Sequence, residues 1–90
     1  MAYIIELSKR AEKDKRIWEK SGNVQIKNEI NRLLTEIIEH PKIGSGDPKE
    51  LTGEFAGCWS RKISKKDRMI YQIFPNYIYI IALRKHYKDH

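Results

Sequence analysis

A chain of 90 residues is long enough for one domain, and its 40% hydrophobic and 33% charged residues are typical of a soluble globular protein. No stretch approaches the roughly 18 apolar residues of a membrane-spanning helix, and the apolar stretch near the N-terminus is too short for a signal peptide. The single cysteine, Cys58, permits no disulfide within the chain. We therefore expect one cytoplasmic domain over residues 1–90, without membrane contact.

The net charge of +6 is concentrated in the last third of the sequence. Residues 1–58 carry ten Lys or Arg and ten Asp or Glu, whereas residues 59–90 carry eight Lys or Arg and two Asp. A cationic surface on one part of a small domain favours a polyanionic partner, with nucleic acid as the first candidate. A solvated basic face without a partner is the alternative.

The first forty residues predict a strand and two helices. Tyr3–Leu7 is apolar enough for a short strand, and Ser8 can cap a helix that runs to about Lys20. Apolar residues then recur with the 3.6-residue period of a second helix, from about Val24 to Glu39. Pro41 ends this helix because a proline disfavours helical backbone at the residue before it.

The second half predicts an irregular segment followed by three strands. Pro41–Gly57 contains four glycines and two prolines, and a loop of this length in a small domain is usually functional. Strands are expected at Cys58–Ile63, Asp67–Ile73 and Tyr77–Arg84. The order β-α-α-β-β-β is typical of a two-layer α+β fold, with the two N-terminal helices on one face of a mainly antiparallel sheet.

The alternation of side chains along these strands predicts which residues share the uncovered face of the sheet. A three-residue turn at Phe74–Asn76 places residue 73 opposite residue 77, and Arg68, Arg84 and His86 then lie on one face. A two-residue turn would separate Arg68 from His86. We expect the three-residue turn, with the helices over the more apolar face, which carries Met69, Tyr71 and Leu83.

Such a face suits the cleavage of RNA. The 2′-hydroxyl attacks the neighbouring phosphorus when a base removes its proton, a cation neutralises the phosphoryl oxygens and an acid protonates the leaving 5′-oxygen. By residue type, His86 suits the acid, and Arg68 suits the phosphate because its planar guanidinium binds two oxygens at once. The reaction needs no metal, and the three histidines and one cysteine show no ligand spacing, so we expect no metal or other cofactor.

Several stretches of the sequence together resemble the YoeB/Txe branch of the RelE-like bacterial toxins. They are Gly44–Pro48, Gly57–Ile63, Arg68 after the hairpin, and the closing Arg84–Tyr87. The resemblance implies the RelE-like microbial ribonuclease fold and the toxin of a type II toxin–antitoxin system, which cleaves mRNA on the ribosome and inhibits translation. The implied partners are a YefM-like antitoxin, mRNA in the ribosomal A site, the ribosome, operator DNA bound by the toxin–antitoxin complex, and a second copy of the chain.

The resemblance also implies roles for single residues. His86 stands at the position of the family's general acid, Arg68 at that of its phosphate-stabilising arginine, and Tyr87 at that of its C-terminal tyrosine. Residues 88–90 extend past this tyrosine, and we expect them to form a mobile tail. The cations expected to contact RNA are Lys49, Arg61, Lys62, Lys65 and Arg84.

The position of the general base departs from the family pattern. The family usually has a glutamate where this chain has Lys49, and Glu50 follows one residue later. On an extended segment, one residue means the opposite side of the chain. Glu50 is our first choice for the base. Glu54, Lys49, or a weakened base assisted by the ribosome are the alternatives.

Two other functions stay open at this point. The missing glutamate favours a non-catalytic relative that acts by contact with a protein such as DNA gyrase, and the charge alone is compatible with a plain RNA-binding module. Rapid arrest of protein synthesis on overexpression indicates the nuclease, whereas DNA damage indicates contact with gyrase.

Overall fold

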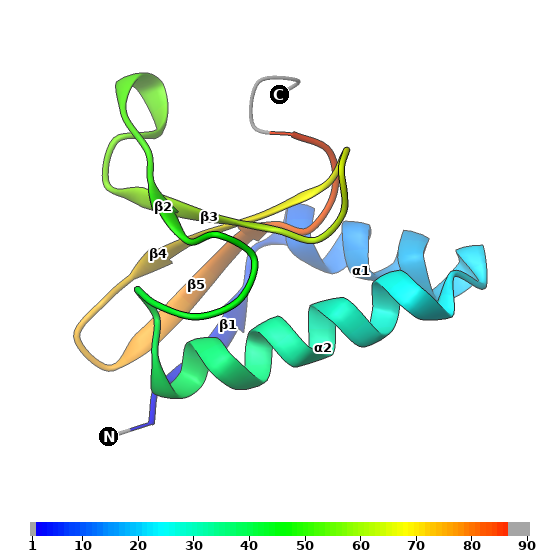
Figure 1. The fold of residues 1–90 in the computed structure, drawn as a ribbon, viewed down its shortest axis with the longest axis horizontal. Coiled ribbons are helices and arrows are strands. Elements are labelled where there is room, and N and C mark those ends of the chain that lie inside the picture. Colours follow the sequence, from blue (N-terminus) through cyan, green and yellow to red (C-terminus); the bar gives the residue numbers. More distant parts are fainter. Residues whose placement is uncertain (1, 87–90) are drawn as a thin grey trace.

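The structure, a computed structural model, describes residues 2–86. Tyr87 and the expected tail at residues 88–90 lie outside the described residues. The strands are β1 Ile4–Leu7, β2 Lys49–Glu50, β3 Cys58–Lys62, β4 Arg68–Ile73 and β5 Tyr77–Ala82, and the helices are α1 Lys9–Ser21, α2 Val24–Glu39 and a short 3₁₀ helix at Gly53–Phe55. Figure 1 shows α1 and α2 on one side of the sheet, which confirms the two-layer α+β fold.

The five strands form one sheet in the order β1-β5-β4-β3-β2. β1 runs parallel to β5, and the other neighbouring pairs are antiparallel, so the sheet is mainly antiparallel as expected. The two-residue strand β2, at one edge, was not predicted because it lies within the irregular segment 41–57. It brings Lys49 and Glu50 beside β3.

Both helices begin and end close to where the sequence predicts. The hydroxyl of Ser8 accepts a hydrogen bond from the backbone N–H of Ala11 (2.9 Å) and caps α1. The bounds of α2 agree with the prediction, and its apolar stripe buries Ile30, Leu33 and Ile37. These side chains pack under the helices against one face of the sheet, which contributes Met69, Tyr71, Ile78, Ile80 and Leu83.

The turn between β4 and β5 has two residues, and the expected three-residue turn was wrong. Phe74 donates its backbone N–H to the carbonyl of Tyr77 (2.9 Å), which leaves only residues 75 and 76 between them. Ile73 consequently pairs with Ile78. Ile78 and Ile80 therefore point into the core under the helices, whereas a three-residue turn would have placed them on the opposite face.

A β-bulge then reverses the alternation a second time. The pairing shifts by one residue between Ile70 and Tyr71, which leaves Ile81 on β5 as the extra residue. Beyond the bulge, Leu83 turns back toward the helices and is 1% exposed, on the face where the sequence placed it. The turn and the bulge each shift the register by one residue, so their effects cancel at the end of β5.

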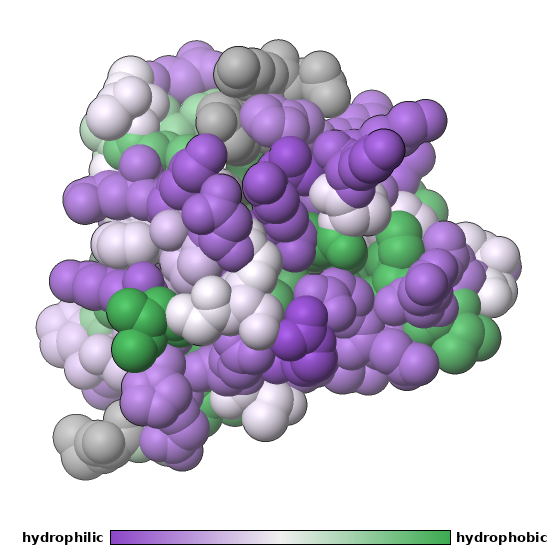
Figure 2. Space-filling view, viewed as in Figure 1, coloured by the Kyte–Doolittle hydropathy of each residue, from purple (hydrophilic) through white to green (hydrophobic). Residues whose placement is uncertain are grey.

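The face of the sheet away from the helices carries a second, smaller apolar cluster. It consists of Leu51, Cys58, Ile70 and Ala82, with Phe55 and Ile81 packed against it. Cys58 is buried, and burial raises the pKa of its thiol, which disfavours the reactive thiolate. Hydrophilic residues cover most of the surface seen in Figure 2. Within residues 2–86, no helix has the length and apolar composition needed to cross a bilayer.

Candidate active site

Lys49, Lys62 and Arg68, which we call the cationic face, lie on the side of the sheet away from the helices. Lys62 pairs directly with Arg68 across β3 and β4, and Lys49 pairs with Ser60. Ser60 pairs in turn with Ile70, which belongs to the apolar cluster on this side. Because residues two apart on a strand share a face, all three cations project from the same surface. The side chains of Lys49 and Lys62 are 62% and 55% exposed.

The turn that precedes β4 holds the guanidinium of Arg68. Its Nη1 donates to the backbone carbonyls of Ser64 (2.7 Å), Lys65 (3.2 Å) and Asp67 (3.1 Å). These bonds, formed among the described residues, all use one nitrogen. The edge formed by Nε and Nη2 is therefore the part of Arg68 that suits two oxygens of a phosphate.

One face of α1 holds the chain that follows β5. Asp14, which is 2% exposed, accepts the backbone N–H of Leu83 (3.0 Å), and Nε1 of Trp18 donates to the carbonyl of Leu83 (2.7 Å). Arg10 pairs with Asp14 (3.1 Å) and donates to the carbonyl of Arg84 (3.2 Å). Residues 10, 14 and 18 are spaced by four and so share one helix face. This anchoring of the chain after β5 was not predicted, although the spacing of these three polar or aromatic side chains was a usable signal.

Asp67 fixes the same segment from the other side. Its Oδ1 accepts the backbone N–H of Lys85 (2.8 Å), and its Oδ2 accepts the hydroxyl of Ser64 (2.9 Å). The N–H of Arg68 donates to the carbonyl of Lys85 (3.0 Å). Lys85 has a φ of 69°, a left-handed conformation that residues other than glycine seldom adopt. These bonds therefore hold a bend directly before His86 and tie that bend to Arg68.

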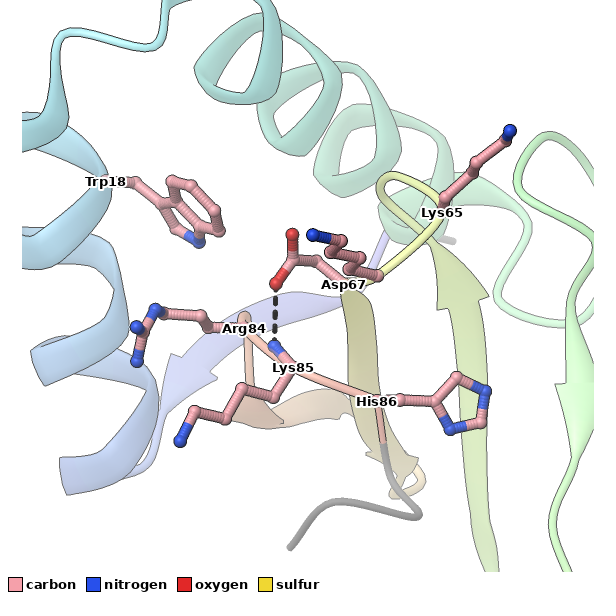
Figure 3. A pocket seen from close by; sticks show the side chains of 7 residues that line it. Trp18, Lys65, Asp67, Arg84, Lys85 and His86 are labelled. Atoms are coloured by element: carbon pink, nitrogen blue, oxygen red, sulfur yellow. Dashed lines mark hydrogen bonds between the residues drawn. The ribbon is translucent and has the colours of Figure 1, made fainter.

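An open cavity of about 710 Å³ lies beside this segment, lined by Trp18, Lys65, Lys66, Asp67, Arg84, Lys85 and His86. Five of these seven residues are basic, counting His86, which suits an anionic ligand. In Figure 3 the side chain of Arg84 points toward α1, whereas that of His86 points the opposite way. The expectation that Arg84 and His86 share one face was therefore wrong. β5 ends at Ala82 and the bend at Lys85 interrupts the alternation.

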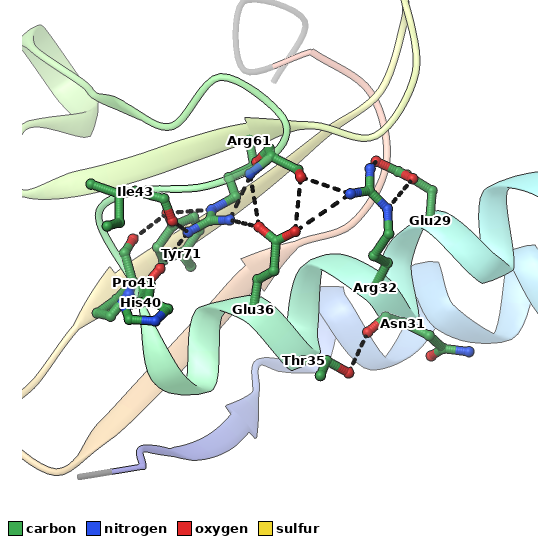
Figure 4. A network of polar contacts seen from close by, with 11 residues as sticks. Glu29, Asn31, Arg32, Thr35, Glu36, His40, Pro41, Ile43, Arg61 and Tyr71 are labelled. Carbon is green, nitrogen blue, oxygen red and sulfur yellow. Dashed lines mark hydrogen bonds and ion pairs between the residues drawn. The ribbon is translucent and has the colours of Figure 1, made fainter.

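Arg61, expected to contact RNA, is completely buried on the helix side of the sheet and is corrected to a structural residue. Its guanidinium donates over 2.6–3.2 Å to the hydroxyl of Tyr71, to Oε1 of Glu36 and to the carbonyls of Ser45, His40 and Ile43. Figure 4 shows these groups gathered around the guanidinium. The contacts anchor the first part of the segment that leads to Lys49.

Glu36 completes this anchor from α2. It accepts the backbone N–H of Ser45 (2.7 Å) and the hydroxyl of Ser45 (2.8 Å), in addition to the bond from Arg61. All of these partners favour the ionised carboxylate. The hydrogen bonds from Ser45, followed by the charge of Arg61, hold the pKa of Glu36 below its ordinary value.

Glu50 lies on the wrong side of β2 to serve the cationic face. It pairs with Trp59, which packs against the core under the helices, whereas Lys49 pairs with Ser60 on the opposite side. The alternation of the short strand thus directs Glu50 away from Arg68, and Glu50 is no longer our choice for the base. Glu54 lies in the 3₁₀ helix and is exposed.

The carboxylate that does meet the cationic face is Asp47, which was not predicted from the sequence. Its Oδ2 lies 3.5 Å from Nζ of Lys49 and 3.7 Å from Nζ of Lys62. Asp47 precedes β2 in an irregular stretch with φ of 54°, where strand alternation gives no prediction. Within residues 2–86, no group of three or more His, Cys, Asp or Glu side chains is arranged to hold a metal ion.

Comparison with known proteins identifies the family. The family model of the YoeB-like toxins of bacterial type II toxin–antitoxin systems matches residues 7–87. The chain is 34% identical over 70 residues to Toxin YoeB of Streptomyces coelicolor, which covers 78% of this chain and 82% of that protein. It is also similar to two solved structures from Staphylococcus aureus, a YoeB–YefM complex (TM-score 0.84, 28% identity) and a YoeB dimer (TM-score 0.86, 27% identity), each covering 97% of this chain and 100% of the other. The chain therefore belongs to the YoeB-like toxins of bacterial type II toxin–antitoxin systems.

Proposed function

We propose that this toxin is a ribosome-dependent endoribonuclease that cleaves mRNA in the A site and thereby inhibits translation. The observation that carries the proposal is the hydrogen bond from the N–H of Arg68 to the carbonyl of Lys85. Together with Asp67, it ties the candidate phosphate-binding arginine to the residue before the candidate acid. A cation and a proton donor held in fixed relation are what the cleavage of RNA by its own 2′-hydroxyl requires.

In the proposed reaction, His86 protonates the leaving 5′-oxygen, and the Nε–Nη2 edge of Arg68 neutralises the phosphoryl oxygens. Such preorganised charges act most strongly where negative charge develops in the transition state. Tyr87 completes the catalytic set. The cations that bind the RNA backbone are Lys49, Lys62, Lys65 and Arg84.

We propose a YefM-like antitoxin, operator DNA and a second copy of the chain as the other partners. The support for the antitoxin and the dimer is the pair of Staphylococcus aureus structures, in which YoeB relatives form those assemblies. An acidic antitoxin segment that lies over the cationic face would cover the site and bind by charge complementarity. Because ribosomes lie in the cytoplasm, a ribosome-dependent nuclease acts there, and we propose a cytoplasmic location for this protein.

Replacing the acid tests the nuclease. In a translating extract, we expect the purified toxin to shorten a defined mRNA and His86→Ala to cleave it about 10²–10⁴-fold more slowly, because general-acid catalysis contributes that much. His40→Ala is the matched control, since the side chain of His40 is exposed at the end of α2. Mapping of the mRNA ends measures both rates. Full activity of His86→Ala would remove His86 from the mechanism.

Lys49, in place of the family's glutamate, favours a second candidate, a toxin that acts by protein contact such as binding of DNA gyrase. Brief overexpression separates the two. Arrest of protein synthesis with intact DNA supports the nuclease, whereas DNA damage with filamentation and continued synthesis supports contact with gyrase.

A further inference from the structure

The cationic face carries donors but needs an acceptor. A protonated lysine has three donor hydrogens and no lone pair, so Lys49 and Lys62 are unable to take a proton from RNA in their ordinary charged state. The guanidinium of Arg68 is unsuited for the same reason. A carboxylate that reaches this face therefore has a chemical role that none of the three cations can fill.

Asp47 is placed for that role by contacts on both sides of the face. Its Oδ2 lies 3.5 Å from Nζ of Lys49, on β2, and 3.7 Å from Nζ of Lys62, on β3. Lys62 pairs directly with Arg68, so the carboxylate lies one strand away from the phosphate-binding position. The side chain of Asp47 is 50% exposed, which leaves it accessible to a substrate.

The backbone holds Asp47 in this place. Gly46, directly before it, accepts the N–H of Lys62 (2.6 Å), and Ser45 is bound by Glu36 and Arg61. Asp47 itself has a φ of 54°, a left-handed conformation that costs a residue with a Cβ free energy and persists where the surrounding contacts support it. The carboxylate is therefore supported by an anchored segment rather than carried on an open loop.

We propose that Asp47 is the general base of the RNA cleavage, in place of the glutamate that the family usually carries at position 49. This inference rests on the proposed nuclease function. Asp47 takes the proton of the 2′-hydroxyl, the 2′-oxygen forms a bond to phosphorus, and the bond from phosphorus to the 5′-oxygen breaks as His86 gives that oxygen a proton. The products are a 2′,3′-cyclic phosphate and a 5′-hydroxyl. When RNA binds, Lys49 and Lys62 exchange their contacts with Asp47 for contacts with the phosphate.

The first experiment measures single-turnover cleavage of an mRNA codon in the ribosomal A site. We expect Asp47→Asn to lower the rate about 10²–10⁴-fold, since an amide accepts no proton and base catalysis contributes that much. Glu50→Gln makes the same chemical change three residues away, on the other side of β2, and we expect it to keep its activity. Asp47→Glu keeps a carboxylate and should recover part of the rate. Thermal unfolding of each variant checks that it is folded.

A substrate with sulfur in place of the bridging 5′-oxygen separates the base from the acid. A thiolate leaves without a proton because thiols are far more acidic than alcohols. We expect this substrate to restore cleavage by His86→Ala and to leave Asp47→Asn slow. If the sulfur substrate restores cleavage by Asp47→Asn, or if Asp47→Asn cleaves the ordinary mRNA at an unchanged rate, Asp47 is not the base. Either result leaves the proposed nuclease function standing. If the unaltered chain leaves the mRNA intact, the nuclease proposal fails and this role fails with it.

Discussion

At the scale of single residues, Glu36 binds two arginines whose surroundings give the two ion pairs different roles. Arg61 is 0% exposed and its bonds reach three backbone carbonyls of the neighbouring segment. Arg32 is 52% exposed and lies one turn from Glu36 on the same helix. Water screens the Arg32 pair, whereas removal of Arg61 takes away the donor that binds three backbone carbonyls from inside the protein.

This contrast predicts a large difference in stability between two matched substitutions. We expect Arg61→Ala to lower the free energy of unfolding by about 3–5 kcal/mol, because five hydrogen bonds of a fully buried side chain are lost together and each contributes about 0.5–1.5 kcal/mol. Arg32→Ala should lower it by at most about 1 kcal/mol, as for exposed pairs. Urea unfolding of both variants gives the comparison. Equal losses would contradict the structural role of Arg61.

At the scale of elements, the segment between α2 and β3 is shaped by how closely Gly46 packs. A Cβ at Gly46 would lie 3.0 Å from the carbonyl oxygen of Lys62 and 3.1 Å from Cβ of Arg61, and neither atom can move without its strand. Gly53 has a similar φ, 69° against 82°, but a Cβ there meets nothing within 4 Å. The two glycines thus share a backbone conformation and differ in the space around them.

A pair of alanine substitutions separates these two effects. Gly53→Ala should lower the free energy of unfolding by roughly 1–2 kcal/mol, the cost of a left-handed conformation in a residue with a Cβ. Gly46→Ala adds the close contacts, and we expect a larger loss together with slower RNA cleavage, because Asp47 follows directly. Unfolding curves and cleavage rates of the two variants test this. The same loss from both would show that packing at Gly46 does not matter.

The elements also show what the sequence could predict. The bounds of α2 and the cap of α1 followed from local signals, a 3.6-residue period and the hydroxyl of Ser8, which act whatever the rest of the chain does. The bulge at Ile81 could not be predicted because it depends on how β5 aligns with β4, and no local residue type marks it. The position of Asp47 was missed for a similar reason, since contacts with distant Arg61 and Lys62 shape the backbone around it.

At the scale of the whole molecule, the stability of the fold depends on pH through Glu36. Its pKa in the folded chain lies below the ordinary value of 4.5, because the N–H and hydroxyl of Ser45, and then Arg61, bind the ionised form. Protonation therefore favours the unfolded chain. The contribution of Glu36 to stability is fully present above pH 4.5 and is lost as the pH falls below that value toward the folded-state pKa.

The prediction is that Glu36→Gln weakens the loss of stability on acidification. We expect the unaltered chain to lose more unfolding free energy between neutral pH and the acid range than the variant does, because the variant has no carboxylate to protonate. Glu39→Gln, at the exposed end of α2, serves as the control and should follow the unaltered chain. Denaturant unfolding across the pH series measures these differences. Parallel curves for Glu36→Gln and the unaltered chain would show that another group controls acid unfolding.

The pairing of β1 with β5 has a consequence for the order of events in folding. β3, β4 and β5 are joined by short turns and can form from local contacts, but β1 and α1 reach β5 only by closing a loop of about seventy residues, as the bond from Ser8 to Ile81 shows. The segment before His86 needs Asp14 and Trp18 from α1 to hold Leu83. A chain that has formed only the three-stranded meander can already bond Lys85 to Asp67 and Arg68, but Leu83 lacks its bonds to Asp14 and Trp18. We therefore expect the segment before His86 to be fully anchored only after α1 packs against β5, and the toxin to become active at that late step of folding.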